Sequence, residues 1–225
     1  QGVVTWAPSL EWRNYPLKDR LAKRFDVPIT VDNDVNLATL GELWFGQGRD
    51  THNMVLITVG TGIGAGLVID GVLYRGQHEA AGEIGYVPPG PAFLGQQYAG
   101  FGALESLASE QALMQRARRA CQVAHPDADT SQMELSDVIA AYQDGEPWAQ
   151  PVIDDAVDYL SLTLSVISAV LDPEKIVIGG SAGAHLGPLL PQLNDRITGV
   201  VPTQPEVLIS ELGLRATVLG TITST

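Results

Sequence analysis

An apolar run followed by closely spaced glycines constrains the fold of this chain more than any other stretch. The run "MVLITV" at residues 54–59 is bounded by polar residues and glycine, which is typical of a buried strand. The glycines of "GTGIGAG" let the backbone turn sharply into a second strand, "GLVID", and Asp70-Gly71 signals a tight turn into "VLY". We therefore expect a buried strand that continues into an antiparallel meander.

Strands and helices alternate along the rest of the chain. The clearest helix signal is an apolar stripe that steps by 4, 3, 4, 3, 4 and ends before Pro173: Ile153, Val157, Leu160, Leu164, Ile167 and Leu171. This alternation, with one meander, predicts an α/β fold. The other expected elements are a strand-like start, helices at 16–25 and about 35–45, strands at 28–31, within "KIVIGGSAGA" and at 206–210, a surface loop at 123–134, and a helix ending near residue 198.

The composition indicates a globular chain that does not bind nucleic acid over its own surface. Its 225 residues are 45% hydrophobic and 17% charged, enough to bury a sizeable core. The formal net charge of −13 repels a phosphate backbone, so contact with DNA would need a separate basic module. No apolar run is long enough for a membrane span, so no membrane partner is expected. Cys121 is the single cysteine, which excludes an internal disulfide and predicts a cytoplasmic location, with Cys121 a partly buried helix residue.

The glycine-rich segment 60–66 is a candidate phosphate-binding loop. It lacks the Lys-Ser/Thr of a P-loop, and it joins two strands rather than the strand and helix of a dinucleotide fingerprint. Glycines at Gly60, Gly62 and Gly64 would let backbone N–H groups approach an anion, and the Thr61 hydroxyl could donate to a phosphate oxygen. A tight β-hairpin without any ligand explains the same residues.

A polar cluster, Asp32-Asn33-Asp34, stands between an expected strand and an expected helix, where ligand sites commonly form in α/β sheets. A carboxylate there can accept a hydrogen bond from a sugar hydroxyl. In a kinase it would take the hydroxyl proton as the oxygen attacks a γ-phosphate. Helix capping explains the same cluster without a ligand.

Five segments in series carry a resemblance to a known family: "GVVTWAPSLEWRNYPL", "ITVDNDVNLATLGE", "VLITVGTGIGAGLVIDGVLYRG", "AAGEIGY" and "IVIGGSAGA". Together they resemble the ROK family of bacterial sugar kinases and sugar-responsive transcriptional repressors. The resemblance implies an actin-like, ribonuclease-H-like fold, a homodimer or higher homo-oligomer, and a small-molecule sugar as ligand. It also implies one ROK domain over residues 1–225, mostly the large lobe, with part of the small lobe missing at the N-terminus.

The resemblance implies a role for each matching residue. Asn33 and Asp34 match the Asn-Asp pair that holds the sugar and, in the kinases, supplies the catalytic base. Glu83 in "GEIG" matches an acceptor of a sugar hydroxyl. The loop 60–66 matches the second phosphate motif, and Gly179-Gly180 match the turn near adenosine.

The zinc motif of the family is not preserved. After "GEIG" the family usually has His, then Cys-x-Cys-Gly-x-x-Gly-Cys-x-Glu, which together hold a structural zinc. Here the His is replaced by Tyr86 and the three cysteines by Gln96, Tyr98 and Ala103, none of which replaces a thiolate on Zn²⁺. We therefore expect no zinc. Glu105 persists as the family's further sugar contact, while Tyr86 is either a hydroxyl donor to the sugar or a buried packing aromatic.

A second departure concerns phosphate transfer. The family's first phosphate motif, Asp-x-Gly-Gly-Thr, whose Asp positions Mg²⁺ in the kinases, has no match in this chain. The chain alone should therefore not transfer phosphate, and ATP and Mg²⁺ are expected only if the full-length protein is a kinase. The abrupt start and a missing final helix suggest a fragment.

Three functions are compatible with these residues. The first is an aldose-binding effector domain of a ROK-type repressor, with a DNA-binding module outside this chain. The second is an ATP-dependent sugar kinase of the glucokinase or hexokinase type. The third is a ligand-free dimerisation domain, in which Asp34, Glu79, Glu83 and Glu105 are solvated or capping groups. The lost zinc ligands and the acidic charge favour the repressor.

Overall fold

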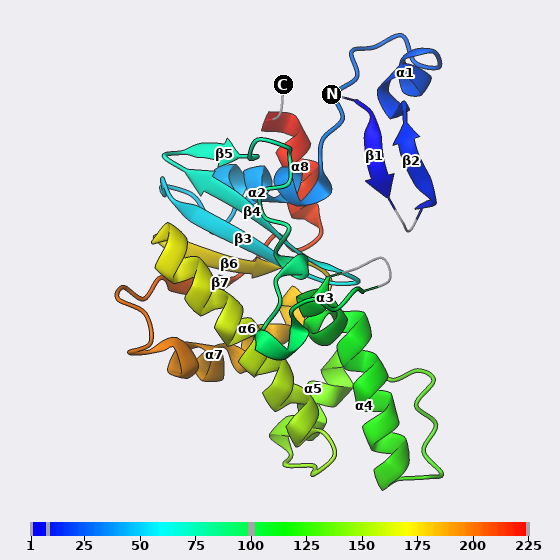
Figure 1. Ribbon diagram of the computed structural model, residues 1–225, viewed down its shortest axis with the longest axis vertical. Helices are drawn as coiled ribbons and strands as arrows, with labels where there is room; N and C mark the ends of the chain where they lie inside the picture. The colour runs from blue at the N-terminus through cyan, green and yellow to red at the C-terminus, as the bar shows by residue number, and fades with distance from the viewer. Residues whose placement is uncertain (1, 8–9, 99–101, 224–225) are drawn as a thin grey trace.

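The computed structural model describes residues 2–7, 10–98 and 102–223, and a five-stranded mixed sheet lies at its centre (Figure 1). The strand order is β5-β4-β3-β6-β7. The first three form the predicted antiparallel meander, and β6 and β7 run parallel to β3. The bounds are β3 Met54–Val59, β4 Ile63–Ile69, β5 Val72–Tyr74, β6 Lys175–Gly179 and β7 Glu206–Ile209.

The turn between β3 and β4 is shorter than the glycine-rich segment suggests. Only residues 60–62 turn, because Gly64 pairs with Thr58 and Gly66 pairs with Leu56 inside the β3–β4 ladder. Gly66 is needed for packing, since a Cβ there would lie 1.7 Å from Oγ1 of Thr39 on the neighbouring helix. Thus two of the glycines serve the approach of a helix to the sheet rather than the turn.

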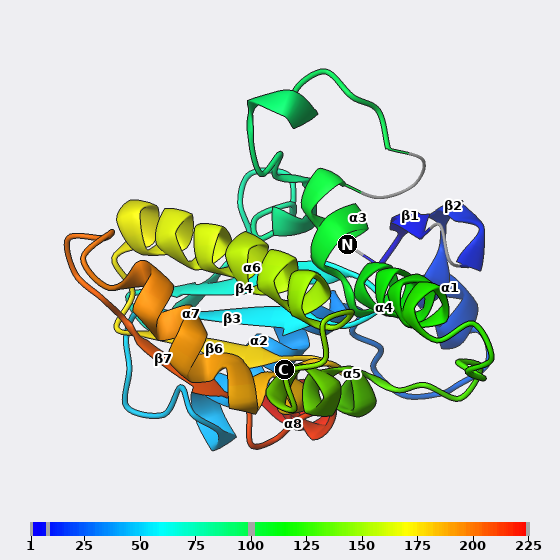
Figure 2. The same ribbon diagram turned by 90° about the horizontal axis from the view of Figure 1, so that it is seen from below.

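Helices cover both faces of the sheet, as Figure 2 shows from below. One face carries the long helix α6 together with α4, α5 and α7, and the other face carries α2 and α8. The bounds are α2 Asp34–Phe45, α3 Ala103–Ala108, α4 Glu110–Ala124, α5 Leu135–Gln143, α6 Gln150–Leu171, α7 Leu190–Ile197 and α8 Arg215–Thr223, with short 3₁₀ helices η2 Ile84–Tyr86, η3 Pro91–Phe93 and η4 Gly183–Leu189.

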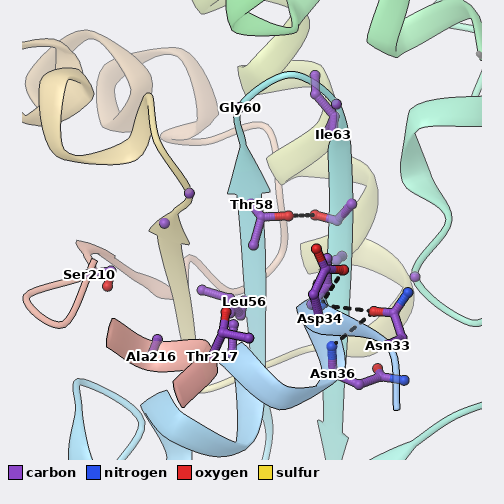
Figure 3. A pocket seen from close by; sticks show the side chains of 18 of the residues that line it. Asn33, Asp34, Asn36, Leu56, Thr58, Gly60, Ile63, Ser210, Ala216 and Thr217 are labelled. Atoms are coloured by element: carbon purple, nitrogen blue, oxygen red, sulfur yellow. Dashed lines mark hydrogen bonds between the residues drawn. The ribbon is translucent and has the colours of Figure 1, made fainter. Parts of the chain in front are cut away.

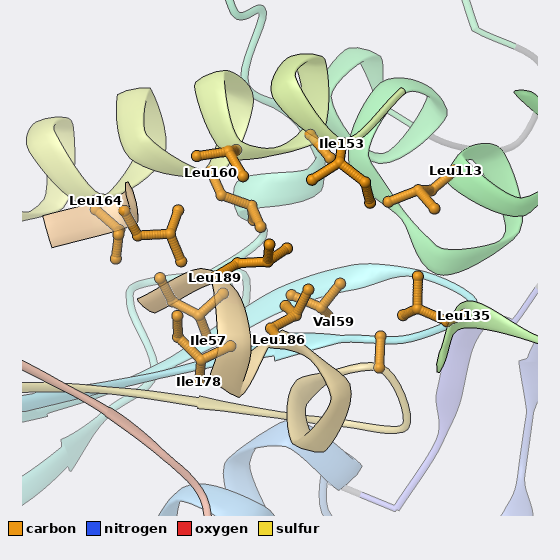
Figure 4. Packing of buried hydrophobic residues seen from close by; sticks show 14 of the residues in the cluster. Ile57, Val59, Leu113, Leu135, Ile153, Leu160, Leu164, Ile178, Leu186 and Leu189 are labelled. Carbon is orange, nitrogen blue, oxygen red and sulfur yellow. The ribbon is translucent and has the colours of Figure 1, made fainter. Parts of the chain in front are cut away.

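Strand β3 explains why a continuous apolar run is needed. Its alternate residues Val55, Ile57 and Val59 enter the core under α6, whereas Met54 and Leu56 enter the smaller core under α2 and α8. The predicted stripe of α6 is confirmed, since its first five residues lie buried in the larger core; Figure 4 labels Ile153, Leu160 and Leu164. Leu171 packs at the edge of that core. Cys121 is also buried, on α4.

The N-terminal part forms a small unit beside the main sheet (Figure 1). Strands β1 Val4–Ala7 and β2 Trp12–Tyr15 pair in an antiparallel sheet, followed by α1 Leu17–Ala22, which is shorter than the expected helix at 16–25. The Trp12 and Tyr15 rings stack with centroids 4.1 Å apart.

Two expected features are wrong. Residues 28–31 form no strand, since Pro28 lacks an N–H donor and no ladder pairs this run with a neighbour in the described residues. A final helix is present, because residues 215–223 form α8 against α2. A glycine on each helix permits this close contact. A Cβ on Gly220 of α8 would lie 1.7 Å from the Leu37 carbonyl oxygen, and a Cβ on Gly41 of α2 would lie 2.0 Å from the Ala216 carbonyl oxygen.

The loop expected at 123–134 begins two residues later than expected, at His125, because α4 extends to Ala124. The helix expected up to residue 198 is present as η4 and α7. In the part of the chain that the structure describes, no helix is both long and apolar enough to cross a membrane.

Candidate functional site

A cavity of about 400 Å³ opens where β3 and β6 end and α2 begins. Its walls come from the first turn of α2, the β3–β4 turn, the segment after β5, the start of α3, and the turn after β6; Figure 3 shows part of it. Ten residues singled out from the sequence line it together: Asn33, Asp34, Gly60, Thr61, Gly62, Gly64, Glu83, Glu105, Gly179 and Gly180.

Asn33 and Asp34 lie where α2 begins. Asn33 is the N-cap residue, since its Oδ1 accepts hydrogen bonds from the backbone N–H groups of Val35 (2.9 Å) and Asn36 (3.1 Å). Oδ1 of Asp34 accepts one hydrogen bond, also from the Val35 N–H at 2.9 Å. Capping therefore accounts for Asn33 and for one oxygen of Asp34. Oδ2 of Asp34 accepts no hydrogen bond from the described residues and remains available to a ligand.

Asp32 belongs to an ion pair that sequence reasoning missed. The terminal nitrogens Nη1 and Nη2 of Arg75 donate to its two carboxylate oxygens, each at 2.7 Å, and the Asp32 side chain is only 13% exposed. Burial acts to raise the pKa of Asp32, but the Arg75 hydrogen bonds and the Asn33 amide together hold it below its ordinary value. This pair joins the start of α2 to the segment that follows β5.

That segment is held against β4 by a close backbone contact. Gly82 has a φ of +88°, and a Cβ there would lie 1.8 Å from the Ala65 carbonyl oxygen. Its own carbonyl oxygen accepts a hydrogen bond from the Ala65 N–H at 2.7 Å. Only glycine permits this approach, which brings Glu79 and Glu83 to the cavity wall.

Glu105, in the first turn of α3, is the least exposed of the predicted sugar contacts. Its Oε2 accepts a hydrogen bond from the Ile63 N–H at 2.8 Å, and its Oε1 is buried without a partner in the described residues. Burial, together with the nearby charge of Glu83, raises the pKa of Glu105. Gly62 makes room for it, because a Cβ there would lie 2.6 Å from Oε2.

Glu42 is a lining residue that sequence reasoning missed. It is fully buried on α2, its Oε1 accepts a short hydrogen bond from the Ser210 hydroxyl, and its Oε2 accepts one from the Gln47 N–H at 3.0 Å. A sequence signal was present, namely an acid among the apolar residues of "LATLGELWF". Its contact with Ser210 could not be foreseen, since Ser210 is far along the chain.

Two glycine turns, the first at residues 60–62 after β3 and the second at Gly180 after β6, lie side by side. The Ala182 N–H donates to the Val59 carbonyl oxygen at 2.9 Å, and Gly180 adopts a φ of +88° where a Cβ would lie 2.4 Å from that oxygen. Within the first turn, the Gly60 N–H donates to the Gly62 carbonyl oxygen at 2.9 Å. The turns therefore form one continuous wall.

Tyr86 lies elsewhere. It ends η2, its side chain is 58% exposed, and it is not among the residues that line the cavity. It is therefore not the buried packing aromatic that was one of its two expected roles. Of the other positions that replace the zinc ligands, Gln96 accepts a hydrogen bond from the Tyr98 hydroxyl at 3.2 Å, and Ala103 is buried in α3.

The charge of the lining limits what the cavity can hold. Among the described lining residues there is no Lys, Arg or His, and five carry a carboxyl group: Asp34, Glu42, Glu79, Glu83 and Glu105. Carboxylates accept hydrogen bonds from hydroxyl groups but repel an anion. The arrangement therefore suits a neutral ligand with several hydroxyl groups. In the described residues, no group of three or more His, Cys, Asp or Glu side chains is placed to hold a metal ion.

Sequence comparison identifies relatives of two kinds. The family model described as "ROK family" matches residues 1–223. A glucokinase of Halalkalibacterium halodurans is 34% identical over 97% of this chain and 70% of its own length. A xylose repressor of Caldicellulosiruptor bescii is 29% identical over 98% of this chain but only 58% of its own length.

Solved structures divide in the same way. A ROK family glucokinase from Streptomyces griseus, in complex with glucose and AMPPNP, superposes with a TM-score of 0.83 at 28% identity, covering 97% of this chain and 75% of that one. A ROK family transcriptional regulator, a homologue of the E. coli MLC protein, also gives 0.83, at 30% identity, covering 98% and 57%. These neighbours confirm the predicted actin-like α/β fold.

Proposed function

Because the chain belongs to the ROK family, we propose that it is the sugar-binding effector domain of a ROK-type transcriptional repressor. One observation carries the proposal: the cavity presents carboxylates and, among its described residues, no basic side chain. A neutral aldose would find acceptors for its hydroxyl groups there without charge repulsion. The repressor and regulator relatives support the same assignment.

Each predicted sugar contact would have a distinct task. Asn33, which already caps α2, would present its side-chain amide, and Asp34 would accept a hydroxyl hydrogen bond through Oδ2. Glu83 would accept one from the opposite wall. The unpartnered Oε1 of Glu105 is the strongest indication, because a buried acceptor without a donor is costly until a ligand hydroxyl supplies one.

Sugar binding would act on the rest of the protein by population shift. The ligand would bridge the start of α2 and the segment after β5, and so favour one arrangement of these walls. We expect a cytoplasmic homodimer that contacts DNA through a module outside this chain, since the net charge of −13 repels DNA. Release of DNA would follow from the coupling between the two sites.

An ATP-dependent sugar kinase of the same family is the second candidate. The glucokinase at 34% identity and the paired glycine turns favour it. Asp34 would then take the proton of the attacking hydroxyl. The described lining residues fit this chemistry less well, because none of them carries a basic side chain that could meet a phosphate. Sugar-dependent ADP release that is abolished by Asp34→Asn would establish the kinase.

The proposal is tested by thermal unfolding with a panel of aldoses. At a sugar concentration roughly 100 times Kd, linkage adds about 2.7 kcal/mol of stability, or about 5–10 °C in Tm for a chain of this size. Asp34→Ala and Glu83→Gln are expected to remove the shift. Glu134→Gln, an equal charge change at the exposed N-cap of α5, should retain it. No shift with any aldose would contradict the proposal.

A further inference from the structure

One carboxylate outside the cavity connects the two glycine turns. Glu110 is the first residue of α4, and its backbone N–H donates to the Gly60 carbonyl oxygen at 2.9 Å. Its Oε2 accepts a hydrogen bond from the Ser181 hydroxyl at 2.6 Å. The start of α4 is thereby attached to the first turn through its backbone and to the second through its side chain.

The Ser181 hydroxyl lies directly over the first turn. A Cβ on Gly60 would lie 2.9 Å from Ser181 Oγ, with no other atom nearer. This hydroxyl is well placed to donate to a phosphate oxygen held between the turns, but its proton is already given to Glu110. A phosphate would therefore have to displace a charge-assisted hydrogen bond and then approach the Glu110 carboxylate itself.

The surroundings offset this charge only in part. Glycine turns bind phosphate through backbone N–H groups, and two of these groups are already used here, since the N–H of Gly60 donates to Gly62 and that of Ala182 to Val59. The described cavity lining adds further carboxylates and no Lys, Arg or His. A phosphate that accepted a hydrogen bond from Ser181 would lie close to the Glu110 carboxylate, and the two negative charges would repel each other, although water reduces this repulsion because the Ser181–Glu110 contact is exposed.

We infer that Glu110, through Ser181, is a specificity residue that keeps nucleotide phosphates out of the glycine turns, so that the neighbouring cavity accepts a neutral sugar without ATP. The inference rests on the proposed sugar-binding function, and it assigns the glycine turns a structural task. A hydroxyl contact and one negative charge thus distinguish a site that senses a sugar from one that phosphorylates it.

The test is calorimetric titration of the protein with ATP, with and without magnesium chloride. Wild type is compared with Glu110→Gln, which keeps the length of the side chain and removes its charge, and with Glu110→Lys, which reverses the charge. Glu134→Gln, at the exposed start of α5, is the matched control. Sugar titrations of the same four proteins run in parallel, because Glu110 does not line the cavity.

ATP affinity is expected to rise at least about tenfold in Glu110→Gln and further in Glu110→Lys, with wild type and Glu134→Gln equally weak. Equal ATP affinity in all four proteins, whether tight or undetectable, would overturn the inference. A gain of nucleotide binding cannot come from a folding defect. If none of the four proteins, wild type included, binds sugar, the proposed function is contradicted, while the comparison of their ATP affinities still tests the inference.

Discussion

At the scale of single residues, the Asp32–Arg75 pair decides how two walls of the cavity meet. Asp32 precedes the N-cap of α2, and Arg75 begins the segment that carries Glu79 and Glu83. Their bidentate contact is geometrically specific, because a guanidinium and a carboxylate present two parallel hydrogen bonds. Arg75 is therefore a positioning residue: it touches no predicted sugar contact, yet it fixes where those contacts lie.

The contribution of this ion pair to the free energy of unfolding should depend on pH in a defined way. The pKa of Asp32 is lower in the folded protein than its ordinary value of 3.8, so the pair stabilises the fold fully above about pH 5, and this contribution is lost as the pH falls through the folded pKa. Asp32→Asn should lower the free energy of unfolding by about 1–3 kcal/mol at neutral pH, a difference that shrinks towards about pH 3. Urea unfolding across this range measures it.

The control for this prediction is Asp127→Asn, a matched change in the exposed loop after α4. It should leave the free energy of unfolding within about 0.5 kcal/mol of wild type at each pH. A difference between Asp32→Asn and wild type that stays constant with pH would mean that the ion pair is not the source of the effect.

At the scale of elements, the crossing of α2 and α8 sets the far wall of the cavity. Ala216 and Thr217 of α8 line the cavity, and their position depends on Gly41 and Gly220, where each helix meets the backbone of the other. A backbone carbonyl cannot rotate away as a flexible side chain can. Any side chain at either glycine must therefore separate the helices.

Gly220→Ala is expected to destabilise the protein by about 1–3 kcal/mol, although alanine is the better helix former by about 1 kcal/mol. Sugar affinity should fall too, because α8 shifts its lining residues. Gly187→Ala is the control, since nothing lies within 4 Å of a Cβ at that position. Chemical unfolding followed by circular dichroism measures both variants, and equal stability of the two would contradict the close crossing.

At the scale of the whole molecule, the acidic charge should be visible in the response to salt. A net charge of −13 destabilises the compact state by self-repulsion, and added ions screen it. Raising sodium chloride from about 20 mM to about 500 mM should increase Tm by several degrees. Affinity for a neutral sugar should change little, whereas the affinity for an anion should rise, because the added ions screen its repulsion by the cavity carboxylates. Calorimetry at both salt concentrations tests the two statements.

The sequence predicts the parts of this molecule that depend on local pattern. The meander, the α6 stripe and the gathering of Asp34, Glu83 and Glu105 follow from periodicity, glycine spacing and resemblance. The contacts that tune the site do not, because their partners lie 43, 71 and 168 positions apart, as in Arg75–Asp32, Ser181–Glu110 and Ser210–Glu42. The exposed position of Tyr86 likewise depends on how η2 packs.

The segment between β5 and η2 has a consequence for how this protein could diverge. Its Gly82 contacts the sheet and its Arg75 pairs with Asp32 just before α2, while residues 77–80 between them are exposed. Its length and sequence can change there without disturbing the core, whereas α2 is fixed at its cap, at Gly41 and at Glu42. A new ligand preference would therefore arise most readily in this segment, through a few mutations that leave the fold and its stability unchanged.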